Sequence, residues 1–475
     1  MNKLVSPIPR SIRRKPVVPF LSVSVLLFFP AGLLAQEITP GDPDLIFEPI
    51  GYTDVIDGFE VDDSFDLNIS LKYLATHSDG TIWREQRAPA TSEADHRDIA
   101  KFIHMVHQLV FGLEVGIYSD LMAYSRLPIV LSDTRELSSI GSRDPVRVVN
   151  VESSASAAGQ ESVVLFGLPF VAPVRSGIPE IDLGIAWGIT NQYRAPYLPT
   201  WVVRLESRWS VGEVLRASCD KPSAALDCHG SPGITSGYHG LRLESRTSYR
   251  YRYLEPYLGA ALQLQWAGLS SYYFLPSLEQ DGDRVRSDEV INSGPPDEIE
   301  AVVGLSILPW EYPGDFQRFI LDFRFNAVWV TEGRDRTPLF DALGASRAEP
   351  LAGTQIELLD PTDEARAGDA PFYGLTDVQS HARFGARMAL IMQAARYLRL
   401  MIGMGLGYTT PHLLTATKKC VLDRSMSEGE DPDPRCPDGG VLNRNYRDAI
   451  DRAGQRFGLG GNLTVDVFTQ ALGTF

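Results

Sequence analysis

A two-residue hydrophobic period runs through residues 99–131. Its odd positions are mostly apolar, whereas its even positions include His104 and Glu114. Because successive side chains of a β-strand point to opposite faces, this pattern predicts a strand. After Ser119 the same parity resumes, which predicts a hairpin whose turn, at 119–121, has an odd number of residues. A soluble strand averages about 5 to 6 residues, and the first arm is far longer, so the chain lines something larger than a compact soluble core.

The same period recurs in twelve segments between residue 65 and the C-terminus. Long gaps, such as 77–98 and 332–380, alternate with short gaps, such as 119–121 and 254–255. Short periplasmic turns and long external loops are typical of bacterial outer-membrane barrels. The pattern therefore predicts an all-β chain: a transmembrane, antiparallel, up-and-down β-barrel of about 12 strands with long extracellular loops, over residues 61–475. A soluble β-sandwich or propeller also has alternating strands, but it would not combine such long strands with this loop rhythm.

Four aromatic residues are spaced as expected for two membrane interfaces. Trp201 and Trp209 share a face and are eight residues apart. For a tilted strand this spacing is roughly 20 Å along the membrane normal, and the ten-residue spacing of Phe319 and Trp329 is about 25 Å. An apolar band of this height between two aromatic girdles is a property of outer-membrane barrels, so we expect these four residues in the girdles.

The C-terminal stretch LTVDVFTQALGTF alternates in the same way and ends in an aromatic residue, Phe475. It predicts the last strand of the barrel. It also predicts the C-terminal signal that the barrel-assembly machinery of the outer membrane reads.

The first 35 residues have the order of a secretory signal peptide: basic residues, an apolar run from Val17, and a small residue at the end. We expect cleavage after Ala35 and export by the general route. An uncleaved anchor helix is the alternative, which Pro19 and Pro30 disfavour. Residues 36–60 then form either a periplasmic tether or a plug in the barrel lumen.

Charge excludes several classes of protein. Without the five basic residues of the signal segment, 39 lysines and arginines face 60 acidic residues, a formal net charge of −21. Such a surface does not favour nucleic acid as a partner. No apolar run of 18 residues or more follows residue 36, which excludes a helical membrane protein on pattern.

The chain has four cysteines, Cys219, Cys228, Cys420 and Cys436. An even count in an exported chain predicts two disulfides. The local pairing, 219 with 228 and 420 with 436, closes the shortest loops and falls in long external loops. A metal site that combines Cys219 and Cys228 with His229 and His239 is the alternative, but a disulfide is favoured outside the cytosol. We therefore expect no metal and no cofactor.

The parity opposite to the apolar one carries many arginines, which we expect to line the lumen: Arg204, Arg208, Arg242, Arg246, Arg250, Arg318, Arg324, Arg383, Arg387 and Arg399. One interpretation is a polar conduit, with the arginines of 381–399 as a positive wall that an anionic solute follows. The other is that charges of both signs pair and fill a narrow lumen, because small barrels hold much side-chain material inside. Both interpretations stay open on the sequence.

An enzyme is the competing class. An outer-membrane hydrolase needs a serine or carboxylate beside a histidine. The eight histidines show no pair at a recognised catalytic spacing, so we expect no enzyme. The acidic stretches SLEQDGDRVRSDEV and PTDEARAGD suggest Ca²⁺ sites that bridge lipopolysaccharide, although such runs are more often simply solvated.

The run YSDLMAYSRLP at 118–128 resembles a segment of outer-membrane proteins associated with meta-pathway phenol degradation, without their usual glycine after the tyrosine. The wider organisation is similar to that of the long-chain fatty-acid channel superfamily and of exported barrels of Gram-negative bacteria. These resemblances imply passive uptake of small, often hydrophobic, molecules. They carry over no binding residue.

These observations together predict an integral protein of the cell outer membrane that acts as a passive channel or facilitator for small solutes, hydrophobic or anionic aromatic. The alternative is a non-conducting structural or receptor barrel whose loops bind a partner. Its surroundings would be outer-membrane lipid and lipopolysaccharide. The identity of the solute and the open or plugged state of the lumen are beyond the sequence.

Overall fold

The computed structural model describes residues 51–55, 66–86, 95–141, 146–149, 163–217, 232–268, 294–346, 348, 351, 372–395, 397–421, 436, 441–443 and 445–475. All of them belong to the unit Gly41–Phe475. The expected signal segment 1–35 lies outside the described residues, as do 36–50 and 56–60 of the expected tether or plug.

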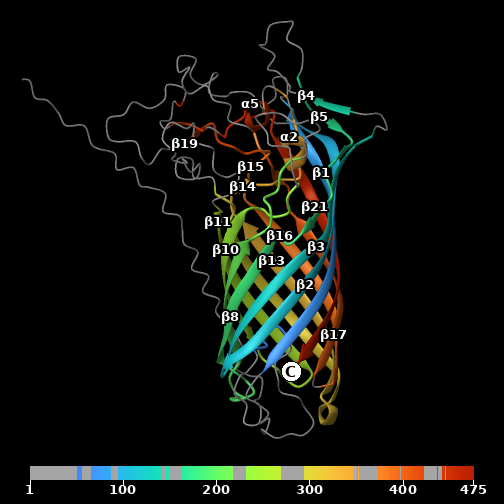
Figure 1. The fold of residues 1–475 in the computed structure, drawn as a ribbon, viewed down its shortest axis with the longest axis vertical. Coiled ribbons are helices and arrows are strands. Elements are labelled where there is room, and N and C mark those ends of the chain that lie inside the picture. Colours follow the sequence, from blue (N-terminus) through green and yellow to red (C-terminus); the bar gives the residue numbers. More distant parts are fainter. Residues whose placement is uncertain are drawn as a thin grey trace, which may run out of the picture. The chain divides into compact units, whose positions relative to one another are not determined.

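Twelve long strands form one antiparallel sheet that closes on itself (Figure 1). In chain order they are β1 (Leu67–Gln86), β2 (Asp95–Tyr118), β3 (Leu121–Ser139), β8 (Glu180–Thr190), β9 (Thr200–Ser210), β10 (Tyr238–Ser248), β11 (Leu254–Ala267), β12 (Glu298–Tyr312), β13 (Gln317–Val330), β16 (His381–Ala395), β17 (Leu398–Thr409) and β21 (Phe457–Thr474). Each strand pairs with the next, and β21 pairs with β1. The predicted all-β, up-and-down barrel is confirmed.

The two ends of the barrel differ. Short turns, with the 3-10 helix η1 (Pro313–Asp315) in one of them, lie at the end that holds the C-terminus, which we call the turn end (Figure 1). The opposite, loop end carries the small elements β4 (Val146–Val149), β5 (Val164–Leu168), β6 (Phe170–Val171), β7 (Arg175–Gly177), β14 (Gly333–Asp335), α2 (Phe340–Gly344), β15 (Thr376–Val378), β18 (His412–Leu413), β19 (Cys420–Val421), β20 (Val441–Leu442) and α5 (Asp448–Asp451).

Several loop boundaries differ from the prediction, two of them markedly. The expected long gap 77–98 is wrong, because β1 runs to Gln86 and β2 already begins at Asp95. The added parts of β1 and β2, within 77–98, form an extension of the barrel wall beyond the predicted strands. The alternation of apolar and polar residues fades there, because the outer face carries polar pairs such as Lys101 with Asp79, 2.7 Å apart. The expected turn at 254–255 is also wrong. The chain turns at 249–253, where Arg252 has a φ of 53°.

The β2–β3 turn contains two residues rather than an odd number. Tyr118 pairs with Leu121, and Asp120 takes a φ of 53°, a left-handed conformation that Asp tolerates better than most residues. A register irregularity between Gly116 and Tyr118 supplies the extra residue that keeps the odd positions on one face.

The outer wall is apolar over much of its height. Large apolar side chains that are more than a third exposed occur on every barrel strand, among them Leu71, Phe111, Leu183, Leu243, Leu262, Val303, Phe325, Met388, Ile402 and Val467. Water-soluble proteins do not expose a continuous apolar surface of this extent, whereas lipid solvates it. The chain is an outer-membrane β-barrel.

Among the described residues, no helix is long and apolar enough to cross a membrane.

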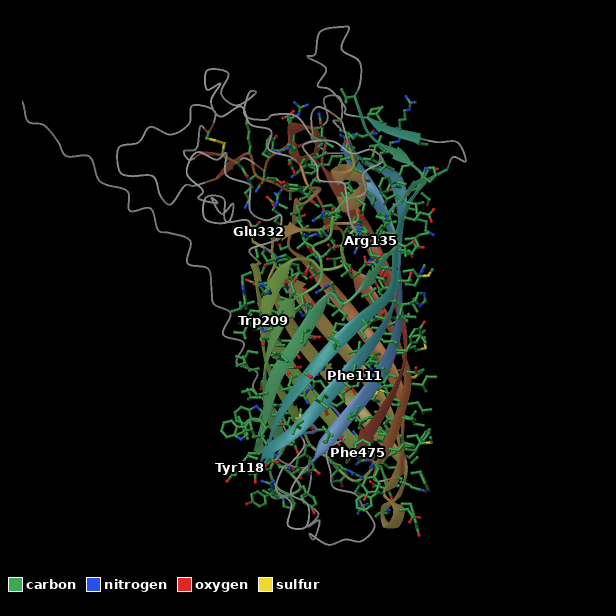
Figure 2. The ribbon with its side chains drawn as sticks, in the orientation of Figure 1. Phe111, Tyr118, Arg135, Trp209, Glu332 and Phe475 are labelled. Carbon is green, nitrogen blue, oxygen red and sulfur yellow. A yellow bond between two sulfur atoms is a disulfide. The ribbon has the colours of Figure 1, made fainter. Side chains whose placement is uncertain are left out.

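The four residues predicted for the girdles lie on the outer wall near strand ends. Trp201 and Phe319 are at the turn end, and Trp209 and Trp329 are toward the loop end. Further exposed aromatic residues accompany them at the turn end: Tyr118, Trp187, Tyr197, Tyr253, Trp310, Tyr312, Tyr397 and Phe475. Figure 2 shows Tyr118 and Phe475 at this end and Trp209 farther from it.

Candidate functional site: the barrel lumen

The predicted arginines lie on the inner wall or, for Arg250, just beyond the end of β10, and most are held by carboxylates. The pairs are Arg208 with Asp182 (3.3 Å) and Glu180 (3.4 Å), Arg246 with Glu244 (2.7 Å), Arg250 with Glu311 (2.7 Å), Arg383 with Glu298 (2.6 Å), Arg399 with Asp54 (3.1 Å), Arg324 with Asp322 (3.8 Å), and Arg242 with Glu300. Charge pairing therefore neutralises much of the positive wall expected over 381–399.

The remaining three of the ten arginines have other partners. Arg204 donates to the backbone oxygen of Asp54 at 3.1 Å, and the fully buried Arg318 donates to Oε1 of Gln393 at 2.8 Å. Arg387 contacts the ring of Phe468 and the Met401 sulfur. One further inward arginine, Arg126, pairs with Glu206 at 3.2 Å.

A separate segment, residues 51–55, contacts this wall, and we call it the stopper. The ring of Tyr52 stacks on Tyr257, with ring centroids 4.5 Å apart. The hydroxyl of Thr53 hydrogen bonds to Ser248 at 2.6 Å. Val55 packs against a buried cluster that includes Tyr124. The stopper thus contacts β3, β9, β10, β11 and β17 through side chains or its backbone.

Two arginines of the inner wall contact the stopper. The guanidinium groups of Arg246 and Arg324 each lie 4.7 Å from the Tyr52 ring centroid, and Arg246 also donates to the Tyr52 carbonyl at 2.9 Å. Arg324 donates to the Tyr257 hydroxyl at 3.2 Å, which in turn donates to Asp322 at 2.8 Å. Cation–π contacts of this kind strengthen where water is excluded.

Glycines on the inner wall make room for these rings. A Cβ at Gly259 would overlap the Tyr52 hydroxyl, and a Cβ at Gly304 would overlap the Tyr257 ring. Gly403 stands opposite Phe468 in the β17–β21 register and faces that ring in the same way. Gly403 thus leaves the space that the ring of Phe468 fills.

Two cations contact the ring of Phe468. Arg387 lies 3.8 Å and Lys72 5.0 Å from its ring centroid. Among the described residues, no carboxylate lies within 4.0 Å of Lys72 or Arg387, in contrast to the paired arginines around them. The Nε of Arg387 is buried and has no hydrogen-bond partner among the described residues. Parity places both cations inward, but only register brings them to one ring.

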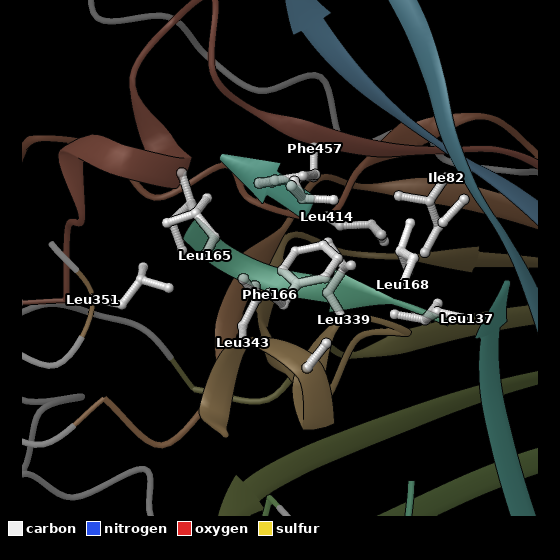
Figure 3. Packing of buried hydrophobic residues seen from close by; sticks show 14 of the residues in the cluster. Ile82, Leu137, Leu165, Phe166, Leu168, Leu339, Leu343, Leu351, Leu414 and Phe457 are labelled. Atoms are coloured by element: carbon white, nitrogen blue, oxygen red, sulfur yellow. The ribbon is translucent and has the colours of Figure 1, made fainter. Parts of the chain in front are cut away.

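The loop end holds a folded hydrophobic core, which we call the loop cap (Figure 3). It combines loop residues such as Leu339, Leu343 and Ile450 with Ile82 and Phe457 from the inner face of the barrel extension, all at most 1% exposed. The sequence suggested only long loops here. Their apolar residues lack a strand or helix period, so no pattern announced a common core.

A buried ion pair anchors α2 in the loop cap. Arg175 and Asp341 are 2.5 Å apart and almost fully buried. Arg175 also donates to the carbonyl of Arg216 at 2.9 Å. Breaking a buried pair on one side leaves an uncompensated charge, so this contact resists opening of the cap.

Asp451 and His412 are among the titratable groups at the loop end whose pKa values are shifted. Burial raises the pKa of Asp451 to about 7, and the nearby Asp377 adds to the shift. Burial lowers the pKa of His412 to about 4, and His381, stacked on it at 3.9 Å, adds to that shift.

Cys420 and Cys436 form a disulfide, as predicted. Cys219 and Cys228 lie outside the described residues, as do His229 and the acidic stretches expected to bind Ca²⁺. Within the described residues, no group of three or more His, Cys, Asp or Glu side chains could hold a metal ion.

One histidine lies beside an acid on the inner wall, which spacing along the chain did not suggest. His104 Nε2 is 3.0 Å from Asp133, and Ser78 lies opposite His104 in the β1–β2 register. The Ser78 hydroxyl hydrogen bonds to Thr464 at 3.0 Å, and the Asp133 carboxylate accepts two bonds from Arg135. Among the described residues, Ser78 and His104 share no hydrogen bond of the kind that a nucleophile and its base make.

No protein-family model matches the chain, and no curated protein matches it. Among solved structures, an outer-membrane channel from Pseudomonas putida F1 is similar at 11% identity and a TM-score of 0.35, over 92% of this chain and 100% of that chain. A Pseudomonas aeruginosa FadL homologue has 9% identity and a TM-score of 0.30 over 86% and 90%. The outer membrane protease OmpT from Escherichia coli has 9% identity and a TM-score of 0.29, over 86% of this chain and 96% of that chain. These similarities concern the fold alone.

Proposed function

We propose that this outer-membrane barrel is a passive conduit for small solutes and that the stopper closes it in the conformation described here. The observation that carries the proposal is the space occupied by Tyr52. The inner wall is notched at Gly259 to receive a ring from a segment outside the barrel strands. If that segment leaves, the wall keeps a polar, arginine-lined opening.

The contacts of the stopper suit a reversible closure. It adds no strand to the sheet, and its attachments are one ring stack, two guanidinium contacts, hydrogen bonds and one ion pair with Arg399. Each such contact contributes on the order of 1 kcal/mol, so thermal or ligand-driven release is feasible. The solute, the membrane lipid and lipopolysaccharide would be the partners, and Phe475 the assembly signal.

The alternative is a non-conducting structural or receptor barrel, and the loop cap favours it. A cap with its own buried core presents a defined external surface and adds a second closure at the loop end. In a conduit the solute must pass the loop cap, whereas a receptor can bind its partner outside the cap.

Planar-bilayer conductance of the refolded full chain separates the two functions. The double variant Tyr52→Ala/Asp54→Ala removes the ring stack and the ion pair with Arg399. We expect longer open times than in the wild type, with Tyr253→Ala, an exposed turn-end tyrosine, as the matched control. If both proteins stay closed and liposomes do not swell in sugars or small organic acids, the structural or receptor function should replace the conduit.

A further inference from the structure

Lys72 and Arg387 stand apart from the other lumen cations because of their partners. The other arginines of the wall reach a carboxylate, an amide or a backbone oxygen, whereas these two cations contact the same aromatic ring. A desolvated charge is unfavourable unless it is paired or hydrogen bonded. An additional negative charge close to the two cations would therefore stabilise them.

The neighbouring groups define how much charge is missing. Asp466 is the acid near both cations, and it accepts a hydrogen bond from Thr76 at 2.7 Å. Arg324, which stands opposite Arg387 in the register, faces Asp322. Two positive charges against the one of Asp466 leave a single positive charge, which a monoanion would balance.

The surroundings of the two cations are partly apolar. Arg387 contacts the thioether of Met401 at 3.7 Å, and both charged groups contact the buried ring of Phe468. A guanidinium beside an ammonium suits a carboxylate, because the guanidinium offers paired donors and the ammonium a point charge. An apolar body next to the carboxylate would lie against the ring edge and the thioether.

We propose that Lys72 and Arg387, which both contact the ring of Phe468, form a binding site for the carboxylate of a small organic monoacid inside the lumen. The proposal rests on the proposed conduit, because a solute must enter the lumen to reach these residues. It goes further by naming the residues that hold the solute and the charge the solute carries.

Titration calorimetry of the refolded full chain in low-chloride buffer tests the site directly. We expect saturable binding of benzoate, and at least a tenfold rise of Kd in the variant Lys72→Gln/Arg387→Gln, because a charge-assisted bond to each cation is lost. Arg383→Gln, whose arginine is already paired with Glu298, is the matched control and should bind like the wild type. Lys72→Arg keeps the charge and should retain affinity within about threefold.

Three results would overturn the site: no saturable benzoate binding by the wild type, an unchanged Kd in the double variant, or inorganic phosphate binding as tightly as benzoate. The heat-induced shift on electrophoresis reports the fold of each variant independently. Conductance keeps the two proposals apart. A stopper-free barrel that conducts but does not bind benzoate retains the conduit and loses the site. A barrel that binds benzoate and never conducts loses the conduit alone.

Discussion

The rings of Tyr52 and Tyr257 stack with centroids 4.5 Å apart, one from the stopper and the other from the inner wall of β11. The contact joins residues separated by most of the N-terminal half of the barrel. Each ring stands against a glycine, Tyr52 at Gly259 and Tyr257 at Gly304. The position of the stopper therefore depends on small residues of the wall as well as on the stopper's own side chains.

Gly259→Ala should unseat the stopper, because the added methyl group would occupy the position of the Tyr52 hydroxyl. We expect conductance similar to that of the Tyr52→Ala/Asp54→Ala variant, measured in planar bilayers. Gly405→Ala is the control, since its Cβ would meet Asp466 only at 3.4 Å, an ordinary contact. Wild-type closure of Gly259→Ala would mean that Tyr52 does not hold the lumen shut.

Tyr257→Phe should destabilise the barrel by about 1 to 3 kcal/mol, because Asp322 loses a donor and Arg324 loses an acceptor in a buried network. Urea unfolding in lipid vesicles, followed by tryptophan fluorescence, measures the change. Tyr253→Phe, at an exposed position of the turn end, should change the free energy of unfolding by close to zero. Equal effects of the two variants would contradict the role of the network.

Leu343→Ala should loosen the loop cap and leave the barrel intact. Leu343 is fully buried in the cap core, and such truncations cost about 2 to 5 kcal/mol, here confined to the cap. Limited proteolysis should cut the loop end of the variant sooner, while its heat-induced electrophoretic shift is unchanged. Leu198→Ala, on a partly exposed turn, serves as control. If the barrel itself melts earlier, the cap is not an independent unit.

Protection of the loop cap should fall as pH rises. The folded state raises the pKa of Asp451 from 3.8 to about 7, so folding favours the protonated acid. The stabilisation is complete below pH 3.8 and is lost as pH passes through about 7. Hydrogen exchange of α5 amides, corrected for intrinsic rates, should show this slope between pH 5 and pH 8 as the difference between the wild type and Asp451→Asn, because that difference subtracts the opposite contribution of His412. Asp448→Asn, on an exposed side chain, should keep the wild-type pH dependence. A slope of opposite sign would refute the assignment.

An arginine on the outer wall should cost more at mid-height than at the rim. Phe325 lies between Phe319 and Trp329 on the same face of β13. We expect Phe325→Arg to lower the free energy of unfolding of the barrel by about 2 to 4 kcal/mol. The introduced charge in Trp329→Arg should lower it by only about 0 to 1 kcal/mol. Unfolding in vesicles gives both values. Similar costs at the two positions would argue against the membrane band inferred here.

Strand number, facing and chain order could be read from the sequence because they depend on a local rule. A residue such as Leu243 or Phe325 points outward by parity alone, and lipid on one side keeps that parity apolar over the whole strand. Where lipid ends, as at Asp79 and Lys101, the rule loses its cause, and the extensions of β1 and β2 were mistaken for a loop.

The lumen divides in the same way. Parity predicted which arginines face inward, but it could not predict which of them meet a carboxylate, because Arg383 and Glu298 lie on strands far apart in the chain. The stopper and the loop cap left no periodic signal, since their contacts come from irregular segments.

The sequence by itself determined a closed, lipid-facing cylinder and its polar inside, because alternation along one strand needs only that strand and its solvent. Only the tertiary structure decided which charges cancel, that Tyr52 fills the space at Gly259, and that Lys72 and Arg387 contact the same ring, Phe468. Those relationships depend on the register between distant strands and on loops that fold back, which no local pattern encodes.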